Sequence, residues 1–186
     1  MPYTPPPELA ALSLAEIAAL IEARGLPPVD QWQPAHRGES EMEIRTDGRW
    51  FHQGGEIRRP AMVRAFASLL RRDEAGQHWL VTPAEALRIA VADAAFIAVD
   101  VKREGAALAF RLNTDDLVIA GPDHPLVARG SAEAPALYLG VRQGCEARLN
   151  RSTWAQLAEI ALAEGAMLGE APAVASQGAV FGLMPA

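Results

Sequence analysis

The chain has 186 residues, half of them apolar and 22% charged, which is typical of a soluble globular protein. Its formal net charge of −6 argues against a general binder of nucleic acid or anionic membranes, and its one cysteine, Cys145, excludes an internal disulfide and a cysteine-rich zinc site. The most apolar stretch, residues 86–101, is interrupted by Arg88, Asp93 and Asp100, so no membrane-spanning segment is expected. The N-terminus lacks the basic and apolar regions of a signal peptide, and we therefore expect a cytoplasmic protein.

The beginning of the chain predicts an arm followed by a helix. Residues 1–12, which are rich in proline, are expected to form a loose N-terminal arm. Ser13 and Glu16 have the spacing of a capping box, in which the Ser hydroxyl accepts a hydrogen bond from the backbone N–H of Glu16. Gly25 ends the apolar helical pattern, so the sequence predicts a helix over residues 14–24.

Residues 13–92 are expected to form an N-terminal α+β half. Its strands are predicted from apolar–polar alternation and flanking turn residues, at 41–45, 50–52, 56–58 and 78–81. The turns between the first three strands are assigned to Asp47-Gly48, in type I′ geometry, and to Gly54-Gly55. Pro60 suits the first turn of a helix whose apolar stripe runs to Leu70.

The run Thr82-Pro83-Ala84-Glu85 has the pattern of a helix start. Thr82 would cap the helix and Pro83 would occupy its first position. We therefore predict a short helix that reaches Ile89.

Residues 93–165 are expected to form a C-terminal half that is richer in β-structure and ends in a helix. The predicted strands are 96–102, 107–112, 117–120, 126–128, 136–142 and 146–149. Ser152 or Thr153 is expected to cap the terminal helix. Residues 166–186, rich in Ala, Gly and Pro, are expected to be a flexible tail.

A short sequence repeat relates the two halves. The pattern Gln-Gly-x-Glu-x-Arg occurs at residues 53–58 and again at 143–148, each time followed by a predicted helix. We interpret this as an α+β fold of two small related halves, each an antiparallel hairpin-rich sheet packed against a helix.

Several motifs together resemble the bacterial family known as domain of unknown function 1285. They lie, in order, at residues 32–34, 47–59, 80–85, 93–96, 123–126 and 141–147, and the resemblance spans residues 26–162. It implies a two-domain α+β protein with a repeated structural motif and a proposed link to bacterial signalling, and it brings no catalytic residues. The chain departs from the family pattern at Ala95, where Pro is expected, and at Leu112, where Thr commonly precedes Asn.

The chain carries none of the common local motifs for catalysis or phosphate binding, so we predict no catalytic residue, metal or cofactor. A zinc site would have to combine distant residues such as His52, Asp123 and His124, for which we favour structural roles. Asp115 and Asp116 are interpreted as turn residues, because neighbours on a strand face opposite sides and do not act together.

A groove between the two halves is the candidate binding site, and it would suit a small anionic ligand. The candidate residues are Trp50, His52, Glu56, Arg58, Arg59, His124, Arg142 and Glu146. The pairs Glu56/Arg58 and Glu146/Arg148 share a strand face, however, so they also predict ion pairs that fix strand register, and we favour that structural interpretation.

The leading functional hypothesis is a non-enzymatic module for ligand binding or signalling, with no nucleic acid and no membrane as partner. One alternative is a hydrolase-like enzyme with a scattered site that uses His52 or His124 as a base. Another is a scaffold that docks a protein partner through an exposed strand edge or helix. The sequence predicts no oligomeric state.

Overall fold

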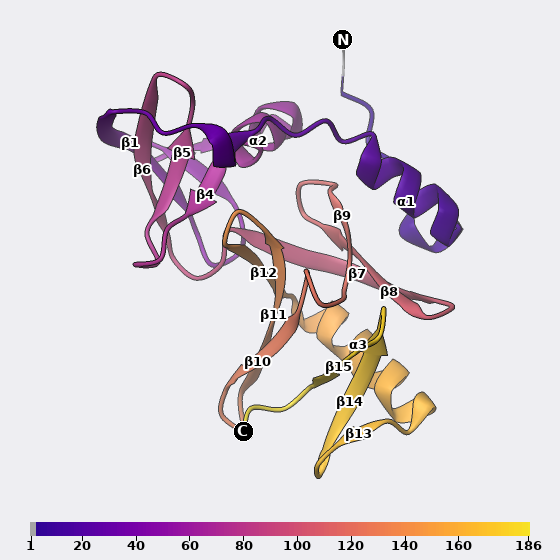
Figure 1. Ribbon diagram of the computed structural model, residues 1–186. Coiled ribbons are helices and arrows are strands. Elements are labelled where there is room, and N and C mark those ends of the chain that lie inside the picture. Colours follow the sequence, from indigo (N-terminus) through magenta and orange to yellow (C-terminus); the bar gives the residue numbers. More distant parts are fainter. Residues whose placement is uncertain (1–2) are drawn as a thin grey trace.

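A computed structural model describes residues 3–186 of the chain. Two six-stranded sheets dominate this part of the molecule, and three α-helices and a smaller sheet lie around them (Figure 1). The α+β class that the sequence predicts is confirmed.

The elements follow one another along the chain as two large sheets and a C-terminal addition. The N-terminal sheet contains β1 (His36–Ile44), β2 (Trp50–His52), β3 (Gly55–Ile57), β4 (Leu70–Arg72), β5 (His78–Val81) and β6 (Glu85–Val91). The C-terminal sheet contains β7 (Phe96–Glu104), β8 (Ala107–Leu112), β9 (Leu117–Ile119), β10 (Leu126–Gly130), β11 (Pro135–Arg142) and β12 (Cys145–Leu149). The third sheet contains β13 (Met167–Leu168), β14 (Ala171–Ser176) and β15 (Ala179–Gly182). The helices are α1 (Leu14–Glu22), α2 (Pro60–Ala67) and α3 (Arg151–Glu164), with short 3-10 turns η1 (Leu9–Ala11) and η2 (Val29–Gln31).

Both six-stranded sheets have the same topology. The first has the order β3-β2-β1-β6-β5-β4, and the second, taken from the equivalent edge, has the order β9-β8-β7-β12-β11-β10. In each sheet the first and last strands of the half are central neighbours and run parallel. The other neighbouring pairs are antiparallel. The two halves are therefore related, but each sheet is mixed and not purely antiparallel.

The repeated Gln-Gly sequence reflects a shared turn geometry. It does not lie at equivalent positions of the two related halves. Gln53-Gly54 has φ values of 49° and 81°, and Gln143-Gly144 has 51° and 75°, so both suit type I′ turns. The first turn joins β2 to β3, whose topological counterparts are β8 and β9, whereas the second joins β11 to β12. Gln177-Gly178, between β14 and β15, has the same backbone, with φ of 50° and 81°. At Asp47-Gly48, by contrast, positive φ is confined to Gly48, so the predicted type I′ turn there is wrong.

Residues 85–91 form strand β6 and not the predicted helix. The Thr82 Oγ1 accepts from the Glu85 N–H at 3.2 Å, as a helix cap would. The Thr82 N–H also donates to the Glu85 carbonyl at 2.9 Å, which closes a hairpin turn. Strand β6 then pairs with β5 on one side and β1 on the other. Pairing on both edges outweighs the local helix signal. The helix stripe predicted to reach Leu70 is also too long, because α2 ends at Ala67 and β4 follows.

The N-terminal arm and α1 pack against the C-terminal sheet. Leu9 and Leu12 are buried with Ile17 of α1 against Ala109 of β8. The Lys102 ammonium donates to the carbonyls of residues 10 and 12 at 3.2 and 2.6 Å. Ser13 caps α1 as predicted. The prediction of a loose arm is therefore wrong for residues 3–12, and residues 1 and 2 lie outside the described part of the chain. Helix α1, assigned by sequence to the first half, lies beside β9 of the second (Figure 1).

The predicted flexible tail is an ordered part of the core. Val174 on β14 is 0% exposed and Leu183 is 2% exposed. The Ser176 hydroxyl donates to the Ala120 carbonyl at 2.7 Å and accepts from the Leu108 N–H at 2.8 Å. Apolar residues spaced for a two-residue period, hidden in an Ala- and Gly-rich segment, build this small sheet.

The two halves share one apolar core. A single cluster of buried residues runs from Ile44 and Trp50 in the first half to Phe96 and Phe110 in the second. At the surface of this junction, the Arg72 N–H of β4 donates to the Gln143 carbonyl at 2.9 Å. The two halves therefore meet in a packed interface.

Candidate functional site

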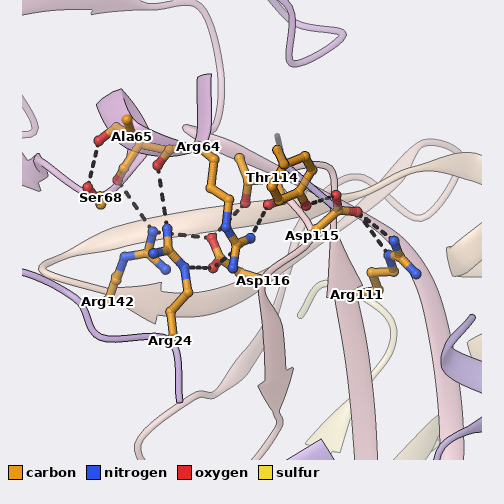
Figure 2. Close-up of polar contacts among 11 residues, drawn as sticks. Arg24, Arg64, Ala65, Ser68, Arg111, Thr114, Asp115, Asp116 and Arg142 are labelled. Carbon is orange, nitrogen blue, oxygen red and sulfur yellow. Dashed lines mark hydrogen bonds and ion pairs between the residues drawn. The ribbon is translucent and has the colours of Figure 1, made fainter. Parts of the chain in front are cut away.

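Three arginines converge on one buried carboxylate at this interface (Figure 2). Asp116, whose side chain is 4% exposed, accepts a hydrogen bond from the Nε of Arg24. Arg64 Nη1 and Arg142 Nη2 lie 3.4 and 3.3 Å from its two oxygens. We call Arg24, Arg64, Arg142 and Asp116 the arginine cluster. The Thr114 hydroxyl adds a hydrogen bond to Asp116 at 2.7 Å.

The members of the arginine cluster come from separate parts of the fold. Arg24 follows α1, Arg64 lies on α2, and Arg142 is the last residue of β11. Each arginine also binds a backbone carbonyl. Arg64 donates to Thr114 at 2.5 Å, Arg24 to Arg64 at 3.4 Å, and Arg142 to Ala67 at 3.4 Å. These bonds fix the guanidinium groups where the N-terminal helix, the first half and the second half meet.

The cluster carries a net positive charge. Burial alone would raise the pKa of the Asp116 carboxyl, but the charge of Arg142 and the hydrogen bonds from Arg24 and Thr114 outweigh it, so this pKa lies below its usual value. Asp116 is therefore ionised at neutral pH. Burial lowers the pKa of Arg142, an effect that Asp116 opposes, and an arginine stays protonated at neutral pH in any case. Three guanidinium groups against one carboxylate leave two positive charges at a partly buried position.

Part of the hydrogen-bonding capacity of the cluster is unused. The Nε of Arg142 is buried without a hydrogen-bond partner among residues 3–186. A guanidinium has five N–H donors, and the bonds within this part of the chain use only some of those that the three arginines offer. Unused donors beside a net positive charge can receive an additional anion.

A cavity of about 600 Å³ opens beside the arginine cluster. Its size is typical of a small-molecule site. Its polar lining comes from the three arginines, Tyr3, Thr4, Asp115, Asp116 and His124, and its apolar lining comes from Pro6, Leu20, Ile21, Ala23, Leu26, Leu117, Val118, Ile119 and Val141. The N-terminal arm and α1 therefore contribute lining on one side, and β9 and β11 contribute it on the other.

Asp115 is held apart from the cluster by its own partners. Its carboxylate accepts from the Tyr3 hydroxyl and from Arg111, at 2.6 Å from Nη2. Burial, reinforced by the hydrogen bond to Asp115, raises the pKa of Tyr3 to about 12. The two neighbouring aspartates thus have different partners, as expected, but the turn role predicted for Asp116 overlooked its three arginines.

Only two of the eight sequence-predicted site residues line this cavity. They are His124, whose Nδ1 lies 3.0 Å from the Gly140 carbonyl, and Arg142. Trp50, Glu56 and Arg58 line a separate hollow of about 430 Å³. Trp50 is 1% exposed and stacks on Phe66 with ring centroids 6.3 Å apart, so it belongs to the core.

The remaining candidates lie elsewhere. His52 is exposed at the end of β2, and Arg59 is exposed as the residue that precedes α2. Glu146 binds Arg129 through two hydrogen bonds of 2.6 and 2.7 Å. Of the two predicted ion pairs, Glu56–Arg58 forms at 3.0 Å, whereas Arg148 pairs with Asp93 at 2.7 Å and not with Glu146.

Sequence reasoning missed Arg24, Arg64 and Asp116. Arg64 lies inside the helix predicted to begin at Pro60, and Arg24 ends the helix predicted over residues 14–24, so neither position indicated a site. The four members of the cluster are 40, 52 and 26 residues apart in the chain, so no short motif connects them. The fold alone brings them together.

Another cavity, of about 650 Å³, lies near the start of α3. Its cations are Arg148, which is already paired with Asp93, and Arg151, which is exposed. Because no buried charges converge there, it is the weaker candidate for an anion site.

Two further findings concern residues 3–186. No three His, Cys, Asp or Glu side chains in this range are grouped closely enough to hold a metal ion. None of its helices has both the length and the apolar character needed to cross a lipid bilayer.

Comparisons with known proteins place the chain in a family. Residues 27–94 match the family model "domain of unknown function (DUF1285), N-terminal domain", and residues 95–183 match "protein of unknown function (DUF1285), C-terminal domain". The boundary between the matched domains falls between β6 and β7, where one sheet ends and the next begins. None of the curated proteins compared with the chain matches it.

Two solved structures are similar. A DUF1285 family protein from Silicibacter pomeroyi DSS-3 is 36% identical, with a TM-score of 0.79 over 94% of this chain and 96% of that one. A second, from Shewanella baltica OS155, is 22% identical, with a TM-score of 0.53 over 63% of this chain and 90% of that one, and it supports the fold alone. Because both domain models match and the first relative is similar along nearly its whole length, the chain belongs to the DUF1285 family.

Proposed function

We propose that the protein is a non-enzymatic binding module, of the kind used in signalling, that holds a small anionic ligand at the arginine cluster. The observation that carries this proposal is the convergence of Arg24, Arg64 and Arg142 on one carboxylate beside a cavity of about 600 Å³. The groove between the halves predicted from the sequence thus has a specific candidate location. Of the residues first assigned to it, His124 and Arg142 remain in the proposed site.

The charge balance favours an anion over a neutral or cationic ligand. The cluster has two uncompensated positive charges, and its side chains are mostly withdrawn from water, with exposed fractions of 16% for Arg24, 23% for Arg64 and 16% for Arg142. Attraction between charges is screened less at such a position than on the open surface. An anion would also accept hydrogen bonds from guanidinium N–H groups that the described residues leave unused.

Calorimetric titration with acetate, phosphate, sulfate and citrate at constant ionic strength tests the proposal. We expect at least one of these anions to bind the native protein, and its Kd to rise about tenfold to a hundredfold in Arg142→Gln, as expected for the loss of a hydrogen bond to a charged group. Arg58→Gln is the matched control, because Arg58 is 83% exposed and lies outside the cavity. Its Kd should equal that of the native protein.

A second variant guards against a folding defect. Arg64→Gln leaves Asp116 with Arg24 and Arg142 as partners. If the cluster is the site, this variant should also bind the same anion more weakly. The proposal is abandoned if folded Arg142→Gln and Arg64→Gln bind as tightly as Arg58→Gln, or if no anion binds the native protein.

A further inference from the structure

The cavity beside the arginine cluster has a charged end and aliphatic walls. We infer that its ligand is an aliphatic carboxylate, with the carboxylate at the arginines and the hydrocarbon chain along the apolar lining. This inference rests on the proposed function and narrows it to one chemical class. It accounts for the apolar lining of the cavity, to which the charges of the arginine cluster give no role.

The walls come from several elements that converge on one space. Helix α1 supplies Leu20 and Ile21, and Leu26 follows just after it. The opposite side is lined by β9, with Leu117, Val118 and Ile119, and by Val141 of β11. Such a lining favours contact with hydrocarbon and offers little to a uniformly polar anion.

Two of these side chains are unusually exposed. Leu20 and Leu26 are 37% and 40% exposed, and both line the cavity. Large apolar side chains lose their contact with water when a hydrocarbon chain lies against them, and each buried methylene group then contributes to affinity. A ligand chain in the cavity would cover both residues in this way.

The shape of the walls favours a flexible aliphatic chain over a flat ring system. Tyr3 and His124 are the residues with aromatic rings among the described lining residues. The Tyr3 hydroxyl is bound to Asp115, and the His124 Nδ1 lies 3.0 Å from the Gly140 carbonyl. Apart from Pro6 and Ala23, the branched side chains of Leu, Ile and Val make up the rest of the apolar lining, and they adapt to a bent chain more readily than to a planar ring.

The head group follows from what the cluster already binds. Asp116 shows that these guanidinium groups accommodate a carboxylate, with nitrogen–oxygen distances of 3.3 and 3.4 Å for Arg142 and Arg64. Guanidinium groups and carboxylates match in planar geometry and charge.

Titration of the full chain with acetate, butanoate, hexanoate, octanoate and 1-octanol tests the inference. We expect affinity to rise up to about fourfold for each added methylene group, which corresponds to the transfer free energy of one such group. Octanoate should bind at least tenfold more tightly than butanoate, and 1-octanol, which lacks the charge, should bind far more weakly than octanoate.

Two leucine variants test where the hydrocarbon chain of the ligand lies. Leu20→Ser should raise the Kd for octanoate about fivefold and leave the Kd for butanoate unchanged. Leu162→Ser is the control, because Leu162 is 73% exposed on α3 and lies outside the cavity, and it should leave both Kd values unchanged. Equal losses in the two variants would point to nonspecific adsorption and overturn the inference.

The possible failures are distinguishable. If butanoate and octanoate bind equally well and Arg142→Gln weakens both, the aliphatic ligand class is wrong while the anion site stands. If 1-octanol binds as tightly as octanoate, or if no carboxylate and no inorganic anion binds, the anion site fails as well.

Discussion

Arg142 Nη2 lies 3.3 Å from an oxygen of Asp116, although their strands are not neighbours. Arg142 ends β11 and Asp116 precedes β9, and β12, β7 and β8 lie between these strands in the sheet. Four strand spacings in a flat sheet would separate them by about 19 Å. The C-terminal sheet must therefore curl until its two sides approach each other, and its two edge strands, β9 and β10, are joined by residues 120–125 alone. The proposed anion site exists because of that curvature.

Neutralising Asp116 should destabilise the protein. In Asp116→Asn the three arginines would repel one another without a central negative charge, and breaking a buried ion pair in this way costs about 3 kcal/mol. Urea unfolding measures the loss. Asp47→Asn is the control, because Asp47 pairs with Arg49 on the surface and should change the unfolding midpoint little. Similar midpoints for the two variants would show that Asp116 does not hold the arginines together.

Small anions should partly replace the lost carboxylate. If the cluster binds anions, adding one to Asp116→Asn should raise its unfolding midpoint more than that of the native protein, because the variant has one more uncompensated positive charge. Thermal unfolding at constant ionic strength measures the difference. The same increase in both proteins would mean that the anion acts elsewhere.

Stability should fall as the pH is lowered through the range in which His78 titrates in the unfolded chain. Burial, followed by the nearby charge of Arg72, lowers the pKa of His78 from 6.5 to about 4. Between these values the unfolded chain binds a proton that the folded protein rejects, so this contribution is fully present above pH 6.5 and is lost as the pH falls to about 4. Its size is about 3 kcal/mol.

Comparing urea unfolding of the native protein and His78→Leu between pH 4 and 7 isolates this effect. The variant should lose less stability on acidification, whereas His52→Leu, altered at an exposed position, should follow the native protein. Parallel pH profiles for the native protein and His78→Leu would refute the assignment.

Two glycines with the same backbone conformation should respond differently to alanine. Gly54 and Gly144 both occupy the second position of a Gln-Gly turn, with φ of 81° and 75°. A Cβ at Gly54 would meet nothing within 4 Å, but at Gly144 it would lie 2.7 Å from the Arg72 carbonyl oxygen. We expect Gly54→Ala to cost about 1 kcal/mol and Gly144→Ala about 3 kcal/mol, because only the latter also forces β4 away from the turn. Chemical denaturation of both variants provides the measurement, and equal losses would mean that the contact between the halves is not tight.

The third sheet, formed by β13, β14 and β15, should contribute to stability. Val174→Ala removes two methyl groups from a fully buried side chain and should cost about 2 kcal/mol. Val180→Ala, at a residue of the same sheet that is 52% exposed, should cost much less. If denaturation shows that both changes are harmless, the segment behaves as the flexible tail that the sequence predicts.

Regular alternation and caps were enough to locate most of the strands and the first helix. Met42 and Ile44 identified β1, and the Ser13 cap identified α1, because these signals depend on nearby residues. Thr82 shows the limit of such signals. The hydrogen bond from the Glu85 N–H to its hydroxyl occurs in a helix cap and equally in this hairpin turn, and the decision lies with β1 and β5, which flank β6.

The site was less predictable than the fold. Arg142 and His124, which the sequence singled out, line the cavity beside the arginine cluster, but Arg24 and Arg64 resembled ordinary surface residues of their helices. Nothing near Asp116 in the chain reveals that a curled sheet and two helices direct three guanidinium groups to it. A charge cluster assembled from four distant segments requires knowledge of tertiary structure.

The parallel pairing at the centre of each sheet has a consequence for the order in which this protein can fold during synthesis. Strand β1 must wait for β6, and β7 must wait for β12, before either sheet has its central pair. The arm and α1 are made well before the surface on which they settle, which is supplied by Ala109 of β8 and by Leu117 and Ile119 of β9. Such long-range contacts slow folding. The arm and α1 therefore cannot dock until β8 and β9 have been made, and the arginine cluster is complete only after Arg142 has been added as well.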